Sequence, residues 1–88
     1  MDRKKIGFNA CLKAIGEGFA ATYRDNMVFS CGETEQGLFC FLGISTVEYE
    51  SDHLSLKSNV DDWEYYASCY VLSDNKVKMD KCKLPALV

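Results

Sequence analysis

The 88-residue sequence is poor in the residues from which catalytic and metal sites are usually built. It holds one histidine, His53, and one proline, Pro85. None of its five cysteines is followed by a second cysteine three positions later, the close pair that usually opens a structural zinc site. A cysteine–histidine nucleophile would need His53 to meet a thiol in space, and no spacing in the chain indicates this. We therefore expect no catalytic residue, no metal site and no cofactor.

Long apolar runs and an excess of positive charge are also missing. No segment approaches the roughly 18 apolar residues that a membrane-spanning helix needs. The net charge is −3 and the sequence pI is near 5.0, which argues against a general affinity for nucleic acid or anionic lipid. Gly16-Glu17-Gly18 lacks the lysine and the spacing of a phosphate-binding loop. We expect neither nucleic acid nor a membrane as a partner.

The cysteines point to a reducing compartment. Their number is odd, and no secretory segment precedes them, because Asn9, Lys13 and Glu17 interrupt the apolar stretch that follows the basic start. Such a set fits free thiols better than a disulfide framework. The sequence predicts a cytoplasmic protein with five reduced cysteines.

What the sequence does contain is enough apolar material for one folded unit. The apolar fraction is 48% and the aromatic fraction 12%, values typical of a globular chain. Eighty-eight residues leave room for a single hydrophobic core. We expect one small domain that spans residues 1–88.

The chain is organised around a predicted β-hairpin at residues 27–44. In its first apolar run, alternate residues fall on opposite faces: Met27, Phe29 and Cys31 on one, Val28 and Ser30 on the other. The second run is apolar on both faces, with Leu38, Cys40, Leu42 and Ile44 opposed to Phe39 and Phe41. A strand of that kind is buried on both sides. Gly32 and Gly37 are expected to bracket the connecting loop.

Residues 2–23 favour a helix. Asp2 can cap it, and a stripe of apolar side chains recurs at helical spacing: Phe8, Leu12, Ile15 and Phe19. The same stretch also alternates from Ile6 to Leu12 as a strand would, but its good helix formers favour the helix. Gly16 and Gly18 weaken the helix, which either ends near Ile15 or continues towards Tyr23. We favour continuation, because Phe19 and Tyr23 extend the stripe.

The remaining chain reads as strands. Residues 46–50 and 53–57 alternate over short stretches, and residues 63–72 form a longer strand with Trp63 and Tyr65 on one face and Tyr66 and Tyr70 on the other. The last strand, residues 76–84, needs a bulge near Asp80-Lys81 to keep its apolar positions on one face. Its lysines suit an exposed edge. The predicted fold is α+β: an N-terminal helix packed on an antiparallel β-meander of about four to five strands.

Two functions from different classes fit this pattern. The first is a non-enzymatic interaction module that self-associates through its sheet as a homodimer, or binds a protein partner. Self-association is expected because one helix covers only one face of the sheet, while two of the predicted strands are apolar on both faces. A second copy, or a sheet curled into a partial barrel, would cover the other face.

The second is a small-molecule-binding protein or a small enzyme with an aromatic pocket. Its lining residues would be Trp63, Tyr65, Tyr66 and Tyr70. Aromatic strand residues are more often plain packing, so we rank this hypothesis second. The acidic residues in the middle of the chain, at positions 48–64, are read as a solvated face, because they lack the spacing of a calcium loop.

Overall fold

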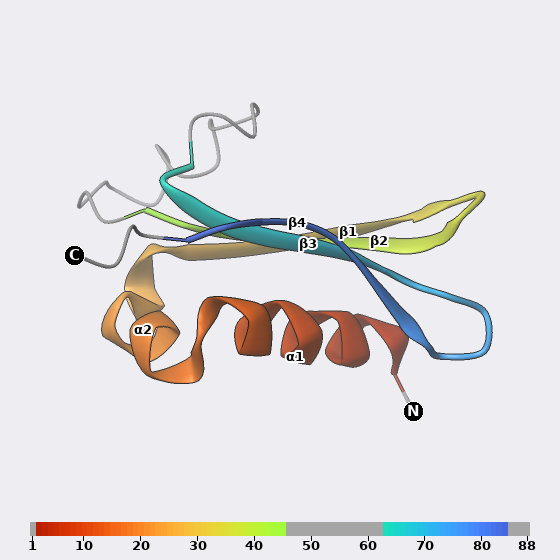
Figure 1. Ribbon diagram of the computed structural model, residues 1–88, viewed down its shortest axis with the longest axis horizontal. Helices are drawn as coiled ribbons and strands as arrows, with labels where there is room; N and C mark the ends of the chain where they lie inside the picture. The colour runs from red at the N-terminus through yellow and green to blue at the C-terminus, as the bar shows by residue number, and fades with distance from the viewer. Residues whose placement is uncertain (1, 46–62, 85–88) are drawn as a thin grey trace.

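The computed structural model describes residues 2–45 and 63–84 of the chain. Two helices, α1 (Arg3–Ile15) and α2 (Glu17–Thr22), and a 3₁₀ turn at Arg24–Asn26 precede the strands β1 (Met27–Thr34), β2 (Gly37–Ile44), β3 (Tyr65–Val71) and β4 (Val77–Lys83). The strands form one antiparallel sheet in the order β1-β2-β3-β4, and both helices lie on the same side of it (Figure 1). The predicted α+β meander is confirmed. Residues 46–50 and 53–57 lie outside the described residues.

The first helix begins where the sequence indicates and ends sooner than we expected. The Asp2 carboxylate accepts a hydrogen bond from the Lys4 backbone N–H at 3.0 Å and so caps α1. At Gly16 the backbone takes a φ of +108°, a conformation open to glycine, and the chain starts again as α2. The predicted continuation to Tyr23 as one helix is therefore wrong. The stripe itself is correct, because Phe19 packs edge-on against Tyr65 with ring centroids 5.0 Å apart.

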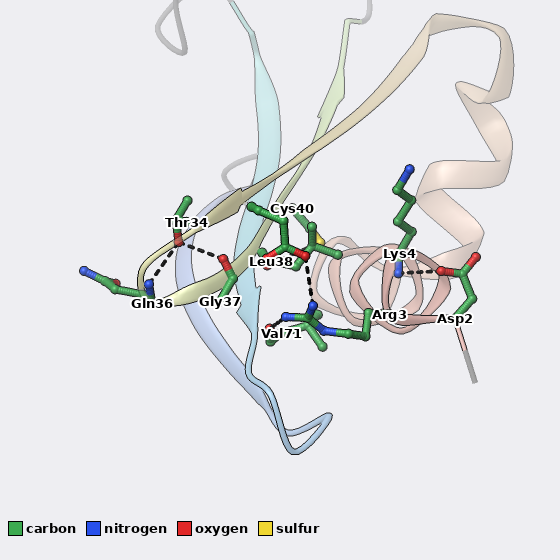
Figure 2. A network of polar contacts seen from close by, with 10 residues as sticks. Asp2, Arg3, Lys4, Thr34, Gln36, Gly37, Leu38, Cys40 and Val71 are labelled. Carbon is green, nitrogen blue, oxygen red and sulfur yellow. Dashed lines mark hydrogen bonds and ion pairs between the residues drawn. The ribbon is translucent and has the colours of Figure 1, made fainter.

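The β1–β2 turn is tighter than the sequence suggested. The pairing runs from Met27↔Ile44 to Thr34↔Gly37, so Gly32 belongs to β1 and only two residues form the turn. The Thr34 hydroxyl donates to the Gly37 carbonyl at 2.7 Å and accepts from the Gln36 N–H at 3.2 Å (Figure 2). Gly37 has a φ of +130°, and a Cβ there would lie 2.6 Å from the Val71 carbonyl oxygen. The close approach of β3 thus requires glycine at this position.

The main core lies between the helices and the sheet. Its buried members come from α1, α2, β2 and β3: Cys11, Ile15, Ala20, Leu38, Cys40, Leu42, Ile44, Ala67, Cys69 and Val71. Met27, Phe29 and Cys31 of β1 pack against it, while Val28, Phe39 and Phe41 belong to a second cluster on the opposite face, the far face. The predicted division of the hairpin into two faces is confirmed, including the burial of β2 on both sides.

Trp63 does not follow the predicted pattern. We expected it on the same face as Tyr65, but it packs against Phe41 in the far-face cluster. The strand β3 begins only at Tyr65, so Trp63 precedes the regular alternation of the sheet. The face of a residue just outside a strand is set by the local path of the chain.

The predicted bulge in the last strand is present. Ser68 pairs with Lys81 and Cys69 with Met79, which leaves Asp80 as an extra residue in β4. The Ser68 hydroxyl donates to the Asp80 carboxylate at 3.2 Å and accepts from the Lys81 N–H at 3.2 Å. The buried Ser68 side chain therefore holds the bulge in place and keeps Val77, Met79 and Cys82 on the helix side.

Candidate functional site

The structure divides the four residues that were predicted to line an aromatic pocket. Tyr66 stacks on Phe41 at a centroid distance of 5.6 Å and an interplanar angle of 27°, and Trp63 lies 6.1 Å from the same ring. Tyr70 contacts Phe39 at 5.3 Å. These rings share the far face, whereas Tyr65 contacts Phe19 on the helix side. Three of the four residues are brought together, and the fourth is separated from them by the sheet.

The far-face rings are packed against one another. Trp63 is 3% exposed and Phe41 9%, while Phe39, Tyr66 and Tyr70 are partly buried. The predicted aromatic pocket did not include Phe39 and Phe41, which complete this cluster. The signal was available, because both residues had been placed on the face opposite Cys40, where strand pairing brings Phe39 opposite Tyr70.

The cysteines form a second grouping, on the helix side of the sheet. Cys31, Cys40 and Cys69 stand opposite one another on β1, β2 and β3. Cys11 of α1 lies above them, with its sulfur 3.8 Å from that of Cys69. Cys69 also contacts the Gly7 carbonyl at 3.8 Å. Three of these thiols are fully buried: Cys11, Cys40 and Cys69.

The environment of these thiols suppresses their chemistry. Burial, with smaller contributions from neighbouring thiols, raises the pKa of Cys11 and raises that of Cys40 to about 12. Burial also raises the pKa of Cys69. A thiol that stays protonated and has no access to solvent is a poor nucleophile. Within residues 2–45 and 63–84, no three cysteine, histidine, aspartate or glutamate side chains are grouped so that they could hold a metal ion.

Thiol reactivity is expected to follow this division. In the native protein, Ellman's reagent should modify the exposed Cys82 first and the partly buried Cys31 more slowly. Cys11, Cys40 and Cys69 should react only after denaturation, when the total should reach the five free thiols that the structure contains. Rapid native modification of a third thiol, or fewer than five thiols in denatured protein kept from air, would contradict this expectation.

A polar hollow of about 480 Å³ lies where the start of α1 meets the β1–β2 and β3–β4 turns. Arg3 enters it from the helix and donates to the Glu33 carboxylate at 2.9 Å. It also donates to the Val71 carbonyl at 2.8 Å (Figure 2). The guanidinium thus ties the helix to both β1 and β3. The charge of Arg3 is already paired with Glu33, and the other charged side chains that line the hollow are acidic, so the hollow is not suited to an anion. Arg3 therefore has a structural role, which is to hold the helix against the sheet.

The two edges of the sheet differ. The strand β1 pairs with β2 over eight residues without a register shift, and its only charged residue is Glu33, near the turn. The strand β4 carries the Asp80 bulge and three lysines, Lys78, Lys81 and Lys83, and is exposed throughout. Lysines and bulges are the devices by which edge strands avoid pairing with other chains. They protect β4 and are lacking on β1.

Comparisons with protein-family models, with curated proteins and with solved structures found no match to this chain. No helix in the described part of the chain is both long and apolar enough to cross a membrane.

Proposed function

We propose that this chain is a non-enzymatic interaction module that self-associates through its β-sheet. The observation that carries the proposal is the open sheet itself: α1 and α2 both lie on one side, and β1 and β4 each have only one neighbour among the described strands (Figure 1). An open sheet offers unpaired backbone groups at its edges and apolar side chains on its faces, which can pair with another chain. Two-fold dimers are the commonest soluble oligomers.

Structural roles account for the groups that could take part in catalysis or bind a ligand. The buried thiols are held in their protonated form by burial. Arg3 is paired with Glu33 and with the end of β3. The N-terminus of α1 is capped by Asp2, so the Lys4 N–H is already bonded to a carboxylate. Each of these groups serves the fold.

The alternative, a small-molecule-binding protein or small enzyme with an aromatic pocket, has less support. A pocket built from Trp63, Tyr65, Tyr66 and Tyr70 would need all four rings on one face, and Tyr65 lies on the other. The exposures of Trp63 and Phe41 leave little ring surface for a ligand between them.

Sedimentation velocity at micromolar concentration tests the proposal. We expect a species of twice the 9.9 kDa chain mass, which dissociates on dilution. Native mass spectrometry of the same sample should show two chains and no bound small molecule. A single 9.9 kDa species across the concentration range would contradict self-association, and a stoichiometric small molecule would favour the alternative.

A further inference from the structure

We infer that the self-association surface is the outer edge of β1, which no other described strand occupies, and that its partner is the β1 edge of a second copy of this chain, paired antiparallel to it. This inference rests on the proposed function and specifies its geometry. It is carried by three properties of β1: a regular backbone, a neutral central stretch, and apolar surface on both sides of the strand.

The backbone of β1 is ready to pair. Its eight residues keep an unbroken register with β2, so alternate N–H and C=O groups point away from β2 in a regular row. From Met27 to Gly32 there is no charge and no proline to prevent a second strand from adding there. An edge of this length without protection is the usual template for strand addition.

Apolar surface flanks this edge on the helix side. A groove of about 260 Å³ opens beside the first residue of β1, with Phe8, Leu12, Ala20 and Met27 among its lining residues. Further along the strand, Phe29 is only partly buried and packs edge-on against Phe8, with ring centroids 5.2 Å apart. A second β1 strand placed antiparallel about Ser30 would bring its own Phe29 and Cys31 to this surface.

The far face contributes as well. Val28 lies next to the edge on that side and is partly buried against the Phe41–Trp63 cluster. Two copies joined at β1 would therefore cover Val28 on the far face and gain apolar contact between Phe29 and Cys31 on the helix side, in addition to backbone hydrogen bonds. Buried apolar area and backbone pairing together are what a lasting strand–strand interface needs.

The other surfaces of the sheet fit a second copy less well. The most exposed large apolar side chains of the described residues, Val77, Met79 and Leu84, lie on or next to β4. There they alternate with lysines, which two β4 edges would bring together, and the Asp80 bulge interrupts the backbone row. On the far face, Phe41 and Trp63 are already buried within one chain, at 9% and 3% exposure.

Symmetry makes the β1–β1 contact self-limiting. Antiparallel pairing of two identical edges places a two-fold axis perpendicular to the sheet, so both pairs of helices lie on the same side. The result is one eight-stranded sheet in the order β4-β3-β2-β1-β1-β2-β3-β4. Both of its outer edges are β4, which carries the lysines and the bulge, so growth stops at the dimer.

The test introduces a charge at the centre of the proposed β1–β1 interface. Ser30 is exposed near the middle of β1, and the two-fold axis brings it close to its own copy. In Ser30→Lys, two like charges meet, and we expect the dimer dissociation constant to rise by about tenfold or more, with the monomer still folded by circular dichroism. Ser30→Thr, a neutral residue that favours strands, is the matched control and should leave the constant within about threefold.

The outcomes separate the two proposals. Suppose that wild type is dimeric, that Ser30→Lys is still dimeric, and that Tyr70→Ser on the far face dissociates the dimer. The β1–β1 contact is then wrong, while the proposed function stands. If wild type is a monomer at all concentrations, both fail. If Ser30→Lys does not fold, amide hydrogen exchange of the wild-type protein provides the test. We expect the β1 amides to become more protected as the protein concentration rises. A gain in protection confined to β4 or to the far face would overturn the β1–β1 contact.

Discussion

Replacing Phe41 by alanine is expected to lower the free energy of unfolding by about 3–5 kcal/mol. The ring is 9% exposed and is held between Tyr66 and Trp63, so truncation leaves a cavity that these neighbours fill only in part. A domain of this size has about 5–15 kcal/mol of stability in all. The melting temperature should accordingly fall by on the order of 15 °C or more, measured by circular dichroism.

The matched comparison for Phe41→Ala uses two further alanine variants. Phe39 lies on the same strand and face but is partly exposed, so Phe39→Ala should cost less. Lys78 is exposed on β4, and Lys78→Ala should change stability by no more than about 0.5 kcal/mol. If Lys78→Ala proved more damaging than Phe41→Ala, the hairpin would not be the centre of the fold.

Gly7→Val should be the other strongly destabilising change. A Cβ at Gly7 would overlap the Cys40 sulfur and lie 2.9 Å from the Cys40 Cβ and 3.3 Å from a methyl group of Val71. Since the Cys40 Cβ is fixed to the backbone of β2, the helix itself would have to move away from the sheet. We expect a loss of about 3 kcal/mol, at the upper end for overpacked cores, measured by urea unfolding.

Gly18→Val provides the control for this effect. Gly18 is also helical, but nothing lies within 4 Å of the position that its Cβ would occupy. The same substitution there should leave stability within about 1 kcal/mol of wild type. Equal losses in the two variants would show that the contact with Cys40 is not responsible.

The hairpin and the last strand were predictable because their signals are local. Alternation along β1 and β2 reports directly which side chains share a face, and this gave the two-sided burial of β2. The slip between Met79 and Cys82 likewise placed the bulge near Asp80-Lys81, and the strand pairing assigns it to Asp80. In the last strand, a register slip of one residue would have turned lysines towards the helix side.

Other features depend on contacts that a linear pattern does not contain. Gly16 left open a helix end near Ile15, but the apolar stripe through Phe19 favoured continuation, and the pattern did not show that Gly16 adopts a positive φ. Trp63 lies just outside β3, where alternation no longer applies. The unprotected edge could not be assigned to β1 either, because that requires the strand order of the sheet.

The order β1-β2-β3-β4 also bears on how the chain reaches its fold. β1 meets β2, and β3 meets β4, across short turns, so closing these pairs costs little chain entropy. The helix α1 instead rests on β2 and β3, and its Cys11 meets Cys69, 58 residues further along. Docking of the helix closes much longer loops and therefore comes late. Changes at the Gly7–Cys40 junction should then act mainly by speeding unfolding, with little effect on the rate of folding.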